Sequence, residues 1–544
     1  MRIASIKAGR ALFHYCTTKK RTSYRVLFLI GVNIEYNLSL VTEVLFSVWL
    51  QPYRENQIYD KLLKLLFILE NNDVKMSLGQ DFLKNMLRLA LPVAVQNLLM
   101  ASFQLIDAAM VSQLGNAAMA GVGMAGRWTF IMMISLFGIN SGAAILYSQY
   151  KGVNDEAGIR RVYGFALVNT MALVVLFGAA MVLFPHALVK VFAGDNNPEA
   201  VRLGVDYMQI IAFNCIVMGF NYATTIMLRS TEEVRIPLIT SVVAVVVNTG
   251  LNYVLIHGKL GFPMLGVQGA AIATVISSLV QMGMLITVVR HRKHPAFACF
   301  RELFAYTKPM VRKFYQVAMP VIMNEVLWSL GTSSYMFVFG RVGGETGVPA
   351  YTLYNSIDQL LFAFVIGMGS ACGVIVGKAV GAGDNERAWQ SAKWFLMMGT
   401  LFAVCMSILE ILLRVPIINL INPADPATGE LATKLLLIGS ANLPLRMLTM
   451  LLIVAIFRSG GRPALGAIID VGAVWLVGVP SVVIAGFVLH LPFLWIFAMT
   501  FTEEIAKVII GLVFFFRKNW MKRLTEHHPQ AEPEGTPVLL LEAE

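Results

Sequence analysis

The sequence predicts an all-α polytopic membrane protein, with twelve transmembrane helices in two six-helix lobes related by a pseudo-twofold axis. Three observations support this fold class. Hydrophobic residues make up 57% of the 544 residues and charged residues only 14%, whereas soluble domains carry about 25% charged residues. Apolar runs of membrane-crossing length recur along the chain. The two halves of this pattern also match each other in sequence, as in transporters built from repeats.

The apolar runs begin after Met76 and are each about 20 residues or longer, which is the length that spans a bilayer as a helix. We expect these helices near 88–110, 120–148, 162–184, 205–228, 236–257, 267–289, 316–339, 350–377, 391–413, 434–457, 464–488 and 493–516.

Residues 1–75 differ from the rest, because a basic polar stretch precedes an apolar run that acidic and amide side chains interrupt. We expect a dispensable N-terminal extension with the native chain starting at Met76; a signal-like or additional membrane segment is the alternative. The remaining chain divides into an N-terminal lobe (76–290), a cytoplasmic inter-lobe connection (291–315), a C-terminal lobe (316–516) and a cytoplasmic tail (517–544). The connection is basic and amphipathic, as expected for a segment on the membrane surface.

Lysine and arginine cluster on alternate connections between the expected helices. Lys151, Arg160 and Arg161 follow the second helix, and seven more basic residues lie between 290 and 313, whereas 190–204 and 259–263 hold few. The positive-inside rule therefore places both termini in the cytoplasm. The net charge of +11 reflects this topology rather than nucleic-acid binding. We expect a multi-pass protein of the plasma (cytoplasmic or inner) membrane, surrounded by lipid and monomeric.

The two halves match at an offset of 228 to 229 residues over most of their length. The matched pairs are Pro92 and Pro320, Asn97 and Glu325, Gly115 and Gly343, Gly138 and Gly367, Ser141 and Ser370, Gly152 and Gly381, Asp155 and Asp384, Arg229 and Arg458, and Pro263 and Pro492. Six helices per half preserve orientation, so the repeats are parallel. Such a protein usually works by rocking one half against the other.

Asp107 is a carboxylate inside the apolar stretch 91–115. Burying an ionised Asp near mid-bilayer costs roughly 2.5–3.5 kcal/mol on insertion scales, and protonating it at pH 7 costs about 4 kcal/mol. Because these costs are comparable, a small change in hydration decides the protonation state, as ion-coupled transport requires. The alternative is a hydrated structural Asp near the helix end.

The chain resembles the multidrug and toxic compound extrusion (MATE) family of efflux antiporters over about residues 80–525. The first half carries LIDAAMVSQLG, KGVNDEAG, LRSTEEVRIP and GKLGFPMLGVQGAAIATVIS, and the second half carries VGKAVGAGDNERA and FRSGGRP. The resemblance implies twelve helices in two lobes around a V-shaped cavity. It also implies alternating-access export of organic, often cationic, drugs and toxic compounds in exchange for protons or sodium ions.

The resemblance further implies that Asp107 is the ion-coupling residue, with Asn248 and Asn252 as partners on the fifth helix and Thr274 as a hydroxyl partner on the sixth. Ordinary cross-linking of membrane helices by buried Asn and Thr is the alternative. Relatives with a sodium-type site often carry Asp where this chain has Asn252. The absence of that second carboxylate slightly favours a proton as the coupling ion, and sodium bound at Asp107 is the alternative.

Glu325, Trp328 and Tyr354 are the expected substrate-binding residues. Glu325 lies in an apolar helix, about one turn before the position of the family's seventh-helix Glu. Aromatic faces attract organic cations, although ordinary packing explains most aromatic residues here. Arg446 needs a partner if it is buried, and Asp358 or Asp470 can supply a structural ion pair. At most one of Glu503 and Glu504 is expected to face inward.

A lipid flippase and a membrane enzyme are the two alternative function classes. A flippase for a lipid-linked precursor shares the superfamily architecture, but it needs several basic residues around a diphosphate, and Arg446 is the one intramembrane base that the pattern supports. A membrane enzyme needs a nucleophile or metal constellation, and the sequence contains no HExxH motif, Walker loop or paired His/Cys spacing. We therefore expect no enzyme activity, no cofactor and no nucleic-acid partner, and small organic substrates.

Overall fold

The computed structural model describes residues 73–193, 197–292, 294, 303–421 and 425–525. The chain forms two compact units, Met1–Asn85 and Met86–Glu544; α4 begins in the first, and the second holds all the side chains discussed below. Most of the predicted N-terminal extension, much of the inter-lobe connection and most of the predicted tail lie outside the described residues.

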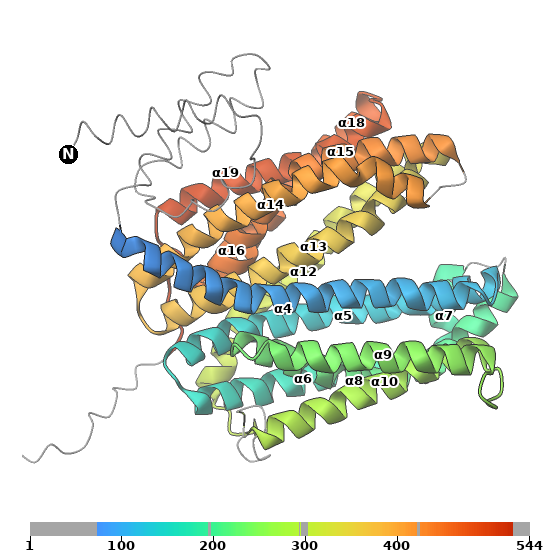
Figure 1. Cartoon of the computed structure of the whole chain (residues 1–544), viewed down its shortest axis with the longest axis horizontal. Helices are drawn as coiled ribbons and strands as arrows, with labels where there is room; N and C mark the ends of the chain where they lie inside the picture. Colours follow the sequence, from blue (N-terminus) through green and yellow to red (C-terminus); the bar gives the residue numbers. More distant parts are fainter. Residues whose placement is uncertain (1–72, 194–196, 293, 295–302, 422–424, 526–544) are drawn as a thin grey trace, which may run out of the picture. The chain divides into compact units, whose positions relative to one another are not determined.

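The first half contains the six expected helices (Figure 1). They are α4 (Asp73–Ser112), α5 (Asn116–Gly152), α6 (Glu156–Leu183), α8 (Pro198–Ser230), α9 (Arg235–His257) and α10 (Gly266–His291). A short helix that the sequence pattern did not predict, α7 (Pro185–Ala193), lies between α6 and α8.

The second half repeats this order. Its helices are α12 (Lys308–Val342), α13 (Gly344–Gly381), α14 (Asn385–Ile421), α15 (Pro426–Thr449) with the π-helical continuation η2 (Met450–Phe457), the composite of α16 (Pro463–Ala473), η3 (Val474–Gly478), α17 (Val479–Val483) and η4 (Ile484–Val488), and the pair α18 (Phe493–Met499) and α19 (Thr502–Phe516). The predicted all-α fold class is confirmed.

Ten helices in the described chain are long and apolar enough to cross a membrane. The expected seventh helix, α12, and the α18–α19 pair are not among them. Large apolar side chains also point outward from the bundle, such as Leu176, which is 66% exposed on α6, and Leu412, which is 68% exposed on α14. Such exposure is costly in water and favourable in lipid, so it fits a membrane-embedded protein.

The last predicted helix, 493–516, was wrong as one continuous element. The hydroxyl of Thr500 donates to the carbonyl oxygen of Phe497 (2.7 Å), and that of Thr502 donates to the carbonyl oxygen of Met499 (2.7 Å). Such local bonds to the backbone compete with helical hydrogen bonding, and α18 ends at Met499 while α19 starts at Thr502.

Matched aspartates start the third helix of each half. Asp155 Oδ1 accepts from the backbone N–H of Gly158 (2.8 Å) at the start of α6. Asp384 Oδ1 accepts from the backbone N–H of Arg387 (2.9 Å) at the start of α14. Both satisfy amides that have no partner within the helix, so these repeated acids are helix caps.

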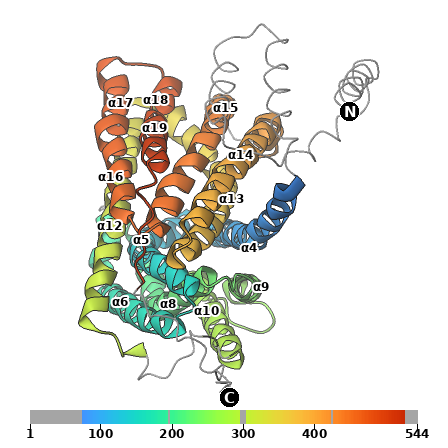
Figure 2. The same ribbon diagram turned by 90° about the vertical axis from the view of Figure 1, so that its left-hand side faces the viewer.

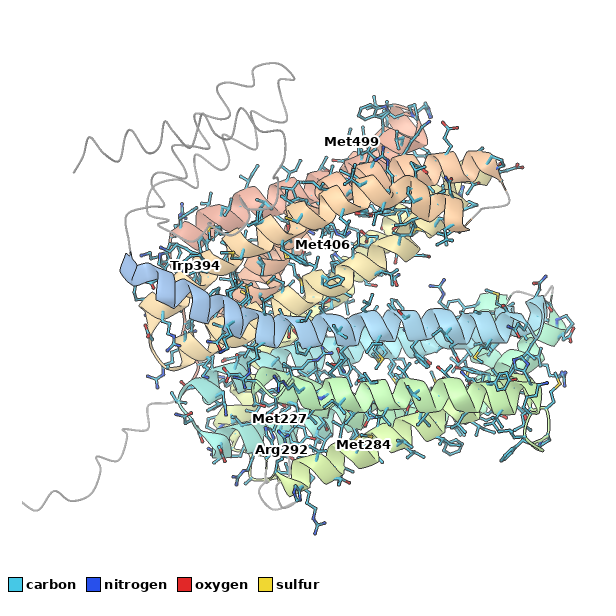
Figure 3. All side chains as sticks on the ribbon, viewed as in Figure 1. Met227, Met284, Arg292, Trp394, Met406 and Met499 are labelled. Atoms are coloured by element: carbon cyan, nitrogen blue, oxygen red, sulfur yellow. The ribbon has the colours of Figure 1, made fainter. Side chains whose placement is uncertain are left out.

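Each half packs around its own core. In the first half, α8 contacts α5, α6 and α10, and α10 contacts α9; in the second half, α13, α14 and α15 contact one another. Figure 2 shows α6, α8 and α10 lying together. Side chains fill both groups, with Met227 on α8 and Met406 on α14 labelled in Figure 3.

The halves meet where α5 packs against α12 and α13. A Cβ atom at Gly152 would lie 2.1 Å from the carbonyl oxygen of Lys378, and a Cβ atom at Gly381 would lie 2.1 Å from the carbonyl oxygen of Gln149. The ends of α5 and α13 therefore touch backbone to backbone. Because each glycine belongs to one matched pair and contacts the other helix, the contact is reciprocal, as a pseudo-twofold relation between the halves requires.

Polar links reinforce this junction from both sides. Lys378 Nζ on α13 lies 2.7 Å from Glu232 Oε1, just after α8. Gln149 Nε2 on α5 donates to the carbonyl oxygen of Ser459, just after η2 (2.9 Å), and Gln149 Oε1 accepts from the backbone N–H of Leu524 (2.7 Å). The second helix of each half thus reaches the turn after the fourth helix of the other half.

Replacing Gly381 by Ala is expected to destabilise the junction, because the new methyl group meets backbone atoms that cannot move independently. We predict a loss of about 1–3 kcal/mol in the free energy of unfolding, as for other overpacked contacts, measured by thermal unfolding in detergent. Gly373→Ala is the matched control on the same helix, since nothing lies within 4 Å of its Cβ position. A Gly381→Ala protein as stable as Gly373→Ala would contradict the close contact.

Candidate functional site

A chain of hydrogen bonds begins at Asp107 on α4 and crosses to α9 and α10. Asn252 Nδ2 donates to Asp107 Oδ1 (2.7 Å) and to Asn248 Oδ1 (2.8 Å). Asn248 Nδ2 in turn donates to the hydroxyl oxygens of Thr274 (3.3 Å) and Ser277 (3.4 Å). The structure therefore brings together all four residues that the sequence placed at an ion-coupling site, and it adds Ser277.

The donor and the acceptor of each hydrogen bond in this series can be assigned. The Thr274 hydroxyl donates to the carbonyl oxygen of Ala270 (3.0 Å), and the Ser277 hydroxyl donates to the carbonyl oxygen of Thr274 (3.0 Å). Each hydroxyl has a single hydrogen, so toward Asn248 both act only as acceptors. Every amide N–H in the chain then points to an oxygen, and one end of the chain is the Asp107 carboxylate.

Local sequence explains the assembly. Asn248 and Asn252 are four residues apart on α9 and so share a face; they are 1% and 0% exposed. Gly269 on α10 lies so close to α9 that a Cβ atom there would sit 2.7 Å from the carbonyl oxygen of Leu255. This close approach brings the face that carries Thr274 to Asn248. Ser277, three residues after Thr274 on the same face, was identifiable by that spacing.

Asp107 has no cationic partner. It is only partly buried, and among the described residues no Lys, Arg or His nitrogen forms an ion pair with it. The side-chain oxygen of Asn252 is fully buried without a hydrogen-bond partner. The site therefore combines a carboxylate that lacks a counter-ion with an unused buried acceptor beside it.

Glu325 on α12 forms an ion pair instead of standing alone. Its Oε1 atom lies 2.7 Å from Nη2 of Arg458, whose side chain is only 3% exposed; the Glu325 side chain is 15% exposed. Arg458 Nη1 also donates to the Ser141 hydroxyl oxygen (3.4 Å). Sequence reasoning noticed Arg458 as a repeated residue but not as the partner of Glu325.

The first half holds a corresponding pair in which a neutral amide, Gln96, takes the place of the acid. Arg229 donates from Nη2 to Gln96 Oε1 (2.6 Å), and Gln96 Nε2 donates to the Ser241 hydroxyl oxygen (2.7 Å). In the second half, two neighbouring residues, Glu325 and Asn324, make the two kinds of hydrogen bond that Gln96 makes alone in the first half. Glu325 accepts from Arg458, and Asn324 Nδ2 donates to Asp470 Oδ2 (3.0 Å).

The other two expected substrate-binding residues lie elsewhere. Trp328, on α12, is 41% exposed. Tyr354 is 4% exposed within the second-half core, and its hydroxyl donates to Asp358 Oδ1 (3.3 Å). Glu325 and Tyr354 therefore belong to different polar clusters, and a shared role in substrate binding stays a prediction.

Two further buried clusters bear on the expected ion pairs. Arg446 Nη1 lies 2.6 Å from Asp358 Oδ1, which confirms Asp358 as its partner. Asp470 pairs instead with Lys507 on α19 (2.9 Å). Lys507 Nζ also lies 3.1 Å from Glu503 Oε1 and 3.8 Å from Glu504 Oε1. The expectation that only one of these two glutamates faces inward was wrong, because both approach Lys507.

A family model, MatE, matches residues 92–254 and 320–484. The two matched segments fall one in each half. They start at the matched prolines of the first helix in each half, so they are independent support for the duplication.

Two similar proteins come from bacteria. A Bacillus subtilis protein described as "Probable multidrug resistance protein YoeA" is 26% identical over 400 residues, which are 72% of this chain and 84% of that protein. A Thermotoga maritima protein described as "Probable multidrug resistance protein NorM" is 23% identical over 453 residues, or 81% of this chain and 93% of that protein.

Solved structures share the fold. A crystal structure of MATE in complex with MaL6 has a TM-score of 0.73 at 21% identity and covers 80% of this chain and 96% of its own. A transporter of the MOP superfamily from Pyrococcus furiosus has a TM-score of 0.73 at 20% identity, with 81% and 96% covered.

Removing the Glu325 carboxylate is expected to leave the buried Arg458 guanidinium without its ion-pair partner. We predict that Glu325→Ala lowers the free energy of unfolding by about 3–5 kcal/mol, the usual result of breaking a buried ion pair from one side. Glu325→Gln retains an acceptor, as Gln96 does for Arg229, and should lose only about 1–2 kcal/mol. Chemical unfolding in detergent micelles measures both, and equal losses would show that Arg458 does not depend on this partner.

Proposed function

Because the chain belongs to the MatE family, we propose that it is an ion-coupled efflux transporter, which exports organic, often cationic, compounds in exchange for protons by alternating access. The observation that carries this proposal is the hydrogen-bonded chain from Asp107 through Asn252 and Asn248 to α10. The names of the relatives from Bacillus subtilis and Thermotoga maritima, both described as multidrug resistance proteins, support export of small organic molecules.

The orientation of the Asn252 side-chain amide favours a proton over sodium as the coupling ion. Sodium needs several oxygen atoms turned toward one point, but here Asn252 Nδ2, rather than its oxygen, faces both Asp107 and Asn248. A proton needs only the carboxylate. Once protonated, Asp107 has an O–H to donate, and the buried unpaired Asn252 Oδ1 is an acceptor beside it. Sodium coupling is retained as an outcome of the test below.

Two features support substrate binding near Glu325. Its carboxylate is not fully buried, so a lipophilic cation can compete with Arg458 for it. The exposed indole of Trp328 lies one helical turn further along α12, and aromatic faces attract cations. We infer that a substrate cation occupies the side of Glu325 that Arg458 leaves open.

A flippase is less well supported. The expectation that Arg446 is the one intramembrane base was too narrow, because Arg458 and Lys507 are also buried in helices. Each of the three nevertheless pairs with a carboxylate. Arg229 on α8 has no carboxylate partner but is held by Gln96 Oε1, so one such base remains for a lipid diphosphate, fewer than the several that a flippase needs. We place the transporter in the plasma membrane as a monomer. The end that carries Lys151 and Lys378 faces the cytoplasm by the positive-inside rule, and the same rule assigns both termini to the cytoplasm.

Asp107→Asn fixes a neutral side chain at the proposed coupling site. We predict that it abolishes uphill export driven by a pH gradient in proteoliposomes while the protein stays folded. Tetraphenylphosphonium serves as the probe, and wild type is compared under an imposed pH gradient and an imposed sodium gradient. Glu156→Gln is the control, since that acid is exposed and forms an ion pair with Arg160 at the start of α6.

Two results would contradict this proposal in different ways. Uphill export that persists in Asp107→Asn removes Asp107 from the mechanism. Export by wild type that follows a sodium gradient at equal pH, with protonophore present, replaces the proton by sodium as the coupling ion.

Glu325→Gln removes a negative charge but retains the acceptor for Arg458. We predict that it weakens transport of tetraphenylphosphonium at least tenfold more than transport of triphenylphosphine oxide, an uncharged molecule of related shape, because a charge at about 4 Å is worth several kcal/mol where water is excluded. Initial rates of counterflow measure both. Equal losses would assign Glu325 a structural role only.

A further inference from the structure

Glu410 is a second carboxylate that the ion pairs of the bundle leave out. It lies on α14, within the apolar sequence SILEILL, and is only 4% exposed. Its Oε1 atom is buried without a hydrogen-bond partner. Among the described residues, no Lys, Arg or His nitrogen lies within ion-pair distance of it. A buried ionised carboxylate without a partner is costly, so its charge has to be removed in another way.

The groups around Glu410 come from both helices that flank α14. Asp358 and Tyr354 on α13 and Arg446 on α15 interact with it electrostatically. Asp358 and Arg446 already pair at 2.6 Å, and the Tyr354 hydroxyl donates to Asp358. This cluster therefore contains two carboxylates and one guanidinium, and the guanidinium is taken by Asp358.

Ser440 on α15 lies beside Glu410 without stabilising its charge. The single hydrogen of the Ser440 hydroxyl is donated to the carbonyl oxygen of Leu436 (2.5 Å), so it is not available to a Glu410 carboxylate. The protonated carboxyl group, which carries no charge, is therefore the form that this buried position favours.

We propose that Glu410 is a second proton-binding site, located in the C-terminal half, which exchanges its proton during transport. In the described conformation the carboxyl group holds the proton. In another conformation Arg446 moves from Asp358 toward Glu410, and Glu410 releases its proton to water as a carboxylate. The cation that this site takes is a proton, and the inference rests on the proposed proton coupling at Asp107.

Infrared difference spectroscopy on purified protein tests the protonation directly, without any transport. Wild type should show a protonated-carboxyl band that disappears as the pH is raised and is absent from Glu410→Gln. Glu430→Gln, which changes an exposed acid paired with Lys434 on α15, should retain the band. A spectrum of Glu410→Gln identical to wild type would overturn the proposal.

Proton exchange during transport is tested by counting protons per exported tetraphenylphosphonium in proteoliposomes. Glu410→Gln should lower the ratio by about one, since one carboxyl group binds one proton, and Glu430→Gln should not. An unchanged ratio in a folded Glu410→Gln protein overturns the role of Glu410 in exchange. A wild type that moves no protons at all instead refutes the proposed function, and the infrared band then still decides whether Glu410 binds a proton.

Discussion

The cost of removing charge from water governs the polar interior of this bundle. In the described helices the buried and partly buried bases of the interior pair with acids or bind an amide oxygen: Arg446 with Asp358, Arg458 with Glu325, Lys507 with Asp470 and Arg229 with Gln96. Among the described residues, the acids Asp107 and Glu410 form no ion pair with a base. Because a buried charge without a partner is costly, both are positions where a proton readily changes the balance of charge.

Duplication followed by divergence explains why the halves differ in polarity. The halves share helix caps and a reciprocal glycine contact, yet the first half joins α4, α8 and α9 by linking Arg229 to the neutral side chains of Gln96 and Ser241. The second half uses Glu325 and Asp470 at the corresponding places. The Asp107 chain, in contrast, is formed by first-half residues only. The halves thus preserve their helix caps and junction contacts while their polar chemistry differs.

Local signals in the sequence predicted the helices and the shared face of Asn248 and Asn252, because both depend on spacing along the chain. The pairing of Glu325 with Arg458 joins residues 133 positions apart and depends on packing, so spacing did not reveal it. Thr500 and Thr502 break the last helix through hydroxyl bonds that hydropathy does not register. Glu410, like Asp107, is an acid within an apolar run. The sequence did not distinguish it from an acid with an ion-pair partner, because only the structure shows that it is buried without one.

In the proposed mechanism, a substrate cation near Glu325 is exchanged for a proton at Asp107, an acid without a counter-ion. The most direct measurement is proton release when tetraphenylphosphonium binds to purified protein in weakly buffered detergent solution, followed with a pH indicator. We expect wild type to release protons as the cation binds, and Asp107→Asn to bind the cation with less release. Saturable binding by wild type with no change in pH would contradict this exchange.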